Sequence, residues 1–174
     1  MKKCISVIAI AALMCLAGVP AANAQFSVSP HAGLAMPFSD LGDAAEFGFG
    51  GGITAIYDIN EDFSGIASFD YHKFGEKDLG LGIKISGAYM PVLAGVMYKI
   101  GDAEMTPYVT AQAGMYLAGG DFADNEFGFA PGFGILKPVG ELTLNVNAKY
   151  NFVMSDPSGQ YLSVNFGLLF PLGK

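Results

Sequence analysis

Polar and apolar residues alternate strictly from Glu141 to Phe152, and this period of two indicates a β-strand. One face of that strand is apolar: Leu142, Leu144, Val146, Ala148, Tyr150 and Phe152. The other is polar: Thr143, Asn145, Asn147, Lys149 and Asn151. Successive side chains of a strand point to opposite faces, so one face meets an apolar medium and the other a wet or polar space.

The same alternation recurs in seven further segments of the chain. They are residues 26–36, 47–59, 63–73, 90–98, 108–116, 127–135 and 162–170. Most are close to the 9–11 residues that a tilted strand needs to cross a bilayer, and eight is an even number. The connections alternate between three tight turns (60–62, 101–104, 139–140) and four longer segments (38–46, 74–88, 119–126, 154–160). This asymmetry is typical of outer-membrane barrels, so we expect an all-β fold, an eight-stranded antiparallel up-and-down transmembrane β-barrel.

A secreted soluble barrel has the same strand count, so the choice between the two depends on which face points outward. In two segments the less hydrophobic face consists of glycine and other small residues: Gly48, Gly50, Gly52 and Thr54, then Gly128, Ala130, Gly132 and Gly134. A row of glycines is a poor solvent face but suits the interior of a narrow barrel. Large residues such as Phe49, Phe69 and Phe133 would overfill that interior. We therefore expect these phenylalanines to face lipid.

The N-terminus has the layout of a secretory signal peptide. Lys2 and Lys3 precede an apolar stretch, and Ala22-Asn23-Ala24 is a small-x-small cleavage site. We expect residues 1–24 to be removed and residues 25–174 to form the barrel domain. The alternative is a lipoprotein signal ending at Cys15, but the residue before a lipidated cysteine is normally small, and here it is Met14.

The charge balance argues against a nucleic-acid partner. Without Lys2 and Lys3 the mature chain has seven lysines against sixteen acidic residues, a net charge of −9. Phosphate binding needs clustered positive charge. Both cysteines, Cys4 and Cys15, lie in the signal segment, so the mature chain has no disulfide and no cysteine metal site.

Over essentially its whole mature length, the chain resembles the OmpA/OmpX-type small outer-membrane barrels. The segment from Asn165 to Leu172 is similar to the C-terminal sorting signal of such proteins, with Asn165, Gly167, Phe170 and Leu172 at its key positions. One departure is that Gly173 and Lys174 follow, whereas these proteins often end on an aromatic residue. The resemblance implies a location in the bacterial outer membrane. It also implies contact with outer-membrane lipid, lipopolysaccharide and the barrel-assembly machinery.

The interior face carries the candidate site residues. We expect a polar plug of the lumen formed by His31, Asp70, His72, Tyr116, Asn147 and Lys149. Asp70 and Lys149 are a plausible ion pair, since buried charges must be paired. The interpretation as a gated ion path is the alternative to the plug. No catalytic residue, cofactor or metal is expected, because neither histidine has a second histidine or a cysteine at ligand spacing.

Two loop segments remain open to more than one interpretation. Leu79, Leu81, Ile83 and Ile85 alternate with smaller or polar residues, so residues 79–88 either extend the fourth strand outward or fold back as a loop. The acidic stretch from Asp121 to Glu126 lacks the ligand spacing of a calcium site and reads as a solvated loop.

Three functions fit this barrel. The leading hypothesis is a non-enzymatic barrel that supports the envelope or binds an extracellular protein partner through its loops. The second is a narrow channel or carrier for small or hydrophobic solutes. The third, a lipid-modifying enzyme, is disfavoured because Ser29, His31, Ser68 and His72 all belong to the interior face.

Overall fold

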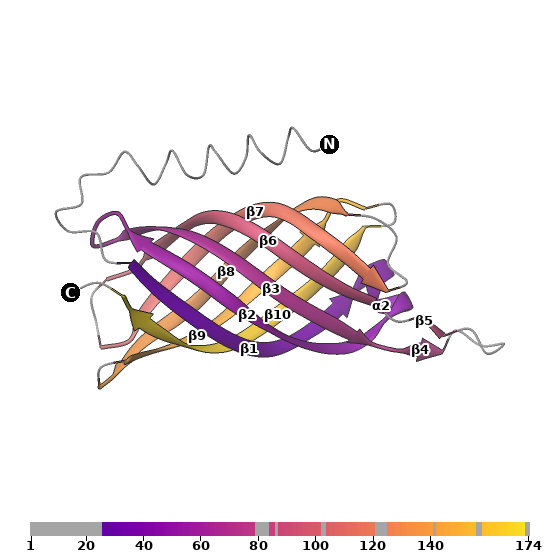
Figure 1. Ribbon diagram of the computed structural model, residues 1–174, viewed down its shortest axis with the longest axis horizontal. Coiled ribbons are helices and arrows are strands. Elements are labelled where there is room, and N and C mark those ends of the chain that lie inside the picture. The colour runs from indigo at the N-terminus through magenta and orange to yellow at the C-terminus, as the bar shows by residue number, and fades with distance from the viewer. Residues whose placement is uncertain are drawn as a thin grey trace.

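The computed structural model describes residues 26–78, 84–85, 87–101, 104–120, 125–140, 142–155 and 158–172. In this part of the chain, eight long strands close into a barrel (Figure 1). They are β1 (Phe26–Phe38), β2 (Glu46–Asp58), β3 (Phe63–Gly75), β6 (Gly87–Lys99), β7 (Thr106–Gly120), β8 (Glu126–Val139), β9 (Leu142–Val153) and β10 (Gly159–Pro171). The expected fold, an eight-stranded antiparallel up-and-down barrel, is confirmed.

The strands are arranged around the barrel in the order β1-β10-β9-β8-β7-β6-β3-β2, with β1 and β2 also paired. Every pair is antiparallel, and the β1–β10 pair joins the first strand to the last. Because β3 and β9 are four places apart in this ring of eight, they lie on opposite walls. Inward side chains of these two strands can therefore meet only across the lumen.

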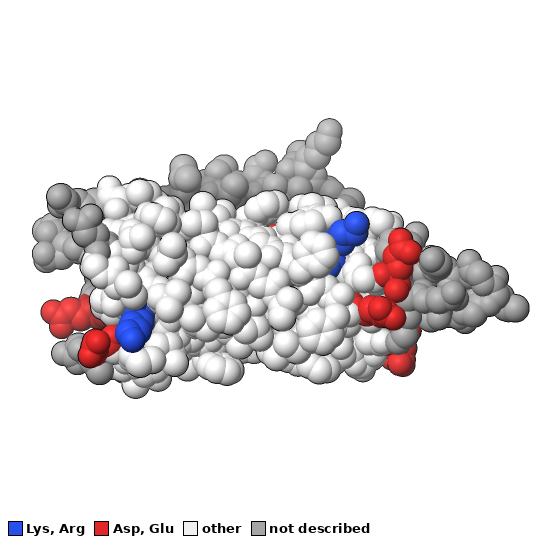
Figure 2. Space-filling model, turned by 90° about the horizontal axis from the view of Figure 1, so that it is seen from below, with Lys and Arg blue, Asp and Glu red and all other residues white. Residues whose placement is uncertain are grey.

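The outer wall is apolar, as the alternation predicts. Large side chains are exposed on every wall of the barrel, including Phe49, Phe69, Val96, Phe133 and Phe166. In Figure 2 the charged side chains gather toward the two ends of the barrel, and the broad middle of this face is almost free of them. Such a band suits the hydrocarbon core of a bilayer. Among the described residues, no helix has the length and apolar character needed to cross a membrane.

Three short elements lie in the segments expected to be loops. The six-residue helix α2 (Ser39–Ala44) follows β1, and its Leu41 is buried with only 6% exposed. The short strands β4 (Lys77–Asp78) and β5 (Lys84–Ile85) pair with each other outside the barrel sheet. Residues 84–85 therefore do not continue β6, whereas Leu79, Leu81 and Ile83 lie outside the described residues. The proposed signal peptide, residues 1–24, lies outside them too.

Candidate functional site

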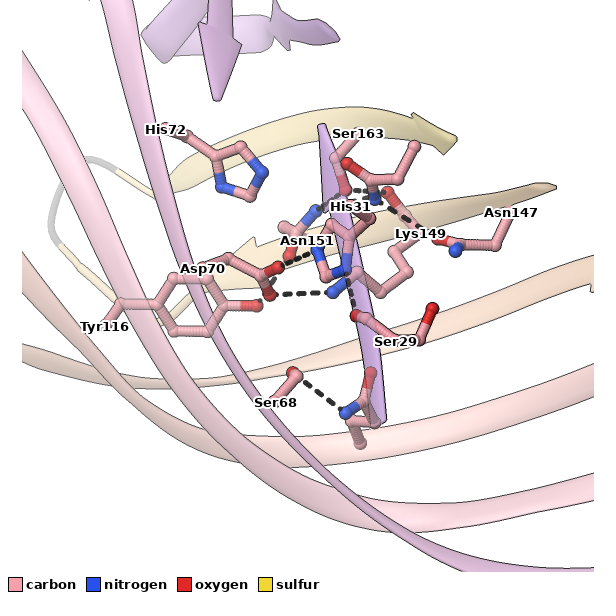
Figure 3. A network of polar contacts seen from close by, with 12 residues as sticks. Ser29, His31, Ser68, Asp70, His72, Tyr116, Asn147, Lys149, Asn151 and Ser163 are labelled. Atoms are coloured by element: carbon pink, nitrogen blue, oxygen red, sulfur yellow. Dashed lines mark hydrogen bonds and ion pairs between the residues drawn. The ribbon is translucent and has the colours of Figure 1, made fainter. Parts of the chain in front are cut away.

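Asp70 lies at the centre of a buried ion-pair network in the lumen (Figure 3). Lys149 Nζ donates to its Oδ2 at 2.8 Å, and His31 Nε2 lies 2.5 Å from its Oδ1. The three residues come from β3, β9 and β1, so the Lys149 contact bridges opposite walls. The side chains of Asp70, His31 and Lys149 are only 0%, 2% and 7% exposed. This network therefore joins three strands in the buried interior.

Both ring nitrogens of His31 face hydrogen-bond acceptors. Its Nδ1 lies 3.2 Å from the backbone oxygen of Ser29, and its Nε2 faces the Asp70 carboxylate. A carbonyl and an ionised carboxylate only accept hydrogen bonds, so both nitrogens occupy donor positions. Asp70 thus receives hydrogen bonds on both of its oxygens, which offsets the cost of burying its charge.

Further hydrogen bonds connect side chains of strands that are not neighbours. Tyr116 donates to Asn151 Oδ1 at 3.0 Å, and Tyr108 donates to Asn145 Oδ1 at 2.6 Å. Gln112 Nε2 donates to Ser68 Oγ at 3.1 Å. Each of these bonds passes over the strand that lies between its two partners in the ring. The lumen is therefore bridged at several levels and not only at Asp70.

Glycines make room for these long side chains. A Cβ added to Gly128 would lie 2.7 Å from a ring carbon of Tyr116, and one added to Gly134 would lie 2.4 Å from the Tyr108 ring. A Cβ on Gly52 would lie 2.6 Å from Asp70 Oδ1. The bare faces of β2 and β8 therefore receive the large residues of β3 and β7, which fills the interior by complementary packing.

Aromatic side chains seal the lumen on the side of the longer connections. Phe74, Tyr89, Tyr116 and Tyr161, here called the loop-end cluster, have ring centroids 5.3–6.4 Å apart where they contact. Leu41 of α2 packs into the same buried cluster. Most contacts are edge-to-face, the favoured geometry for aromatic pairs. The cluster places a dry layer between the Asp70 network and the loops.

A small polar cavity lies on the opposite side of the Asp70 network. Its volume is about 20 Å³, and Lys149, His31, Gln112, Asn147 and Tyr108 are among its lining residues. That volume is enough for about one water molecule. Toward the turns, buried apolar residues close the lumen again: Ile56, Ile66, Met97, Tyr108 and Leu136. Nearby, Lys99 Nζ donates to Asp58 Oδ1 at 2.8 Å.

The six proposed plug residues have different surroundings. His31, Asp70 and Lys149 form one network, and Asn147 accepts a hydrogen bond from Asn165 Nδ2 at 3.1 Å. Tyr116 belongs to the loop-end cluster and also bonds to Asn151. His72 is not bonded to Asp70. Its Nδ1 pairs with the Tyr161 hydroxyl at 3.2 Å, and its Nε2 has no partner among the described residues.

Sequence reasoning missed the apolar layers at both ends of the lumen. Phe74, Tyr89 and Tyr161 are fully or nearly fully buried, as are Leu93 and Met97. The signal that could have found them is the alternation itself, since Tyr89, Leu93 and Met97 share the inward face of β6. Apolar residues on both faces of a strand conceal this signal. Among the described residues, no cluster of three His, Cys, Asp or Glu side chains could hold a metal ion.

Replacing Tyr108 with phenylalanine should lower the free energy of unfolding by about 1–3 kcal/mol, because the buried Asn145 oxygen loses its donor. Urea titration of the folded barrel in lipid vesicles measures this change. Tyr98→Phe is the matched control, since Tyr98 is 40% exposed on the outer wall and its ring contact with Phe63 would remain. Equal stability of the two variants would contradict the buried hydrogen bond.

Comparison with known proteins supports this architecture. The model of the outer membrane protein beta-barrel domain family matches residues 8–170. Neisserial surface protein A has a similar structure, with a TM-score of 0.65 and 19% identity over 85% of this chain and 98% of that one. Ail, the attachment invasion locus protein of Yersinia pestis, gives a TM-score of 0.53 and 17% identity over 84% of this chain and 97% of Ail. Among curated proteins, none matches the sequence.

Proposed function

The chain belongs to the outer membrane protein beta-barrel domain family, and we propose that it is a non-enzymatic barrel that acts through its surface. Family membership places it in the bacterial outer membrane. The proposed role is to support the envelope or to bind an extracellular partner through the longer connections. The observation that carries the proposal is the filled lumen, in which three layers of side chains include only a small cavity of about 20 Å³ beside the Asp70 network. The exterior is then the part of the molecule that can contact a partner.

The charge of the loop side favours a cationic partner. Asp40, Asp43, Glu46 and Glu76 are all exposed there, and we call the first three the acidic rim. One similar structure is Ail in complex with the heparin analogue sucrose octasulfate, which is a polyanion. An acidic rim repels polyanions, so we propose that this chain differs from Ail in the charge of its partner.

A charge-removal experiment tests this role. The variant Asp40→Asn, Asp43→Asn, Glu46→Gln removes the acidic rim. The control variant Glu61→Gln, Asp62→Asn, Glu104→Gln removes three exposed charges at the turn side. Each is expressed in a strain that lacks the protein, and sensitivity to detergent and vancomycin is measured. The control should restore the wild-type barrier, whereas the rim variant should not. Full restoration by both variants would contradict a role for the rim.

The two alternative functions, a narrow channel and a lipid-modifying enzyme, lead to different expected results. The polar cavity next to Lys149 is the observation that favours a narrow channel, and conductance measurements address it. A lipid-modifying enzyme needs reactive side chains on the lipid face, but Ser29, Ser68 and His72 are buried in the interior. We therefore expect the lipid A mass spectrum of the deletion strain to equal that of the wild type. A modified lipid A species that disappears with the gene would support the enzyme.

A further inference from the structure

The small polar cavity beside the Asp70 network is bordered by basic side chains and by no carboxylate. Lys149 and His31 both line it, and none of its lining residues is Asp or Glu. Asp70 bonds to both basic side chains but is not one of the lining residues (Figure 3). The cavity therefore faces the positively charged part of the network.

The network holds more positive than negative charge. Both ring nitrogens of His31 lie in donor positions, toward a backbone carbonyl oxygen and Asp70 Oδ1, and only the protonated, cationic ring donates from both. Lys149 supplies a second cation, whereas Asp70 is the only carboxylate that bonds to either of them among the described residues. The other ion pair described in the lumen, Lys99 with Asp58, has one charge of each sign. A net positive charge thus lies in the interior, where a charge without a counter-ion is costly.

Hydrogen-bond donors on the cavity wall have room for one small acceptor. Lys149 Nζ has three N–H groups, and among the described residues its only acceptor is Asp70 Oδ2. Gln112 Nε2 donates one of its two N–H groups to Ser68 Oγ, which leaves a second one. The cavity volume of about 20 Å³ admits about one water-sized species. A chloride ion is only slightly larger than water, whereas sulfate and gluconate are too large to enter.

We propose that this cavity is a binding site for one small monovalent anion of the size of chloride. The anion accepts hydrogen bonds from Lys149 and Gln112 and supplies the negative charge that balances His31. A water molecule fills the same volume but leaves the excess charge in place. Buried apolar clusters close the lumen on both sides, so the anion is held within the barrel and is not conducted. The site therefore stabilises the barrel, independently of the proposed role of the surface.

Linkage between chloride binding and folding tests the site. The full mature protein is titrated with urea in lipid vesicles at a series of chloride concentrations, and sodium gluconate keeps the ionic strength constant. Because only the folded barrel has the cavity, binding of one anion raises the folding equilibrium constant. Above the dissociation constant, each tenfold increase in chloride should raise it about tenfold, which is a slope of about one on a double-logarithmic plot. A flat plot would mean that water fills the cavity and would overturn the proposal.

Two histidine variants show whether the effect comes from this cavity. His31→Gln removes one of the two cations and leaves the neutral pair of Lys149 and Asp70, so the slope should fall to about zero. His72→Gln makes the same change at the other interior histidine, which does not line the cavity, and should keep the slope of the wild type. Heat-modifiable gel mobility confirms that both variants fold. An unchanged slope in His31→Gln, or a lost slope in His72→Gln, would place the chloride effect elsewhere and overturn the proposal.

Bromide locates the anion directly and needs no variant. Crystals of the wild-type protein are grown with bromide in place of chloride, and diffraction is measured at the bromine absorption edge. One anomalous peak is expected in the cavity, within hydrogen-bonding distance of Lys149 Nζ. Peaks confined to the surface, or none at all, would show that the cavity holds no anion and would overturn the proposal.

Discussion

Replacing Lys149 with methionine is expected to lower the free energy of unfolding by about 3–5 kcal/mol, because it leaves Asp70 buried without its main counter-charge. The Asp70 side chain is 0% exposed and Lys149 reaches it across the lumen, so loss of the ammonium group leaves the carboxylate charge in the buried interior. His31 remains as the second partner and limits the loss to this range. Urea unfolding of the barrel in lipid vesicles, followed by heat-modifiable gel mobility, measures the change.

Two control variants distinguish the buried charge from loss of packing. In the double variant Lys149→Met, Asp70→Leu, most of the stability should return, since replacing both members of a buried pair by apolar residues is often neutral. Lys99→Met breaks the ion pair with Asp58, whose two side chains are 19% and 24% exposed, so the loss should be much smaller. A Lys149→Met barrel as stable as the wild type would rule out this account of the network.

Replacing Val146 with arginine is expected to destabilise the barrel by about 2–4 kcal/mol, the cost of a cation on the lipid face near the bilayer midplane. Val146 is in the middle of β9 and pairs with Ile135 and Phe166, both of which are exposed on the outer wall. Its neighbour in sequence, Asn147, bonds to the buried Asn165 inside the barrel. The substitution therefore tests whether this face of β9 meets lipid and whether Val146 lies near the bilayer midplane.

The control uses the fact that the cost of an arginine on the lipid face depends on its depth in the bilayer. Val139→Arg introduces the same charge on the outer wall at the turn-side end of β8, where Val139 is 58% exposed. Near the interface the cost falls to about 0–1 kcal/mol. Equal losses at Val139 and Val146, measured by the same urea titration, would mean that the hydrocarbon core is not centred on the middle of β9.

The barrel was predictable from sequence because a membrane strand must keep its period along its whole length. The polar face of β9 is the clearest case, and it led directly to the pairing of Lys149 with Asp70. Only the distance between the two side chains shows that they meet across the lumen. Sequence could therefore propose this ion pair but could not show that it spans the lumen.

The ends of the lumen were less predictable for a physical reason. Tyr161 and Phe74 are apolar enough to face lipid, which conceals the alternation that places them inward, and both are buried in the closed barrel. The helix α2 was also missed, because its six residues are too few for a helical period to be visible.

Planar-bilayer conductance of the purified wild-type protein tests whether its lumen is closed. The Asp70 network and the apolar layers on both sides of it should prevent any stable channel event. The variant Tyr116→Ala, Lys149→Ala removes one side chain from the loop-end cluster and one from the network, and it should leak if its heat-modifiable mobility shows that it still folds. We expect no conductance from the unmodified barrel, and steady, well-resolved channel events from it would show that the lumen is open.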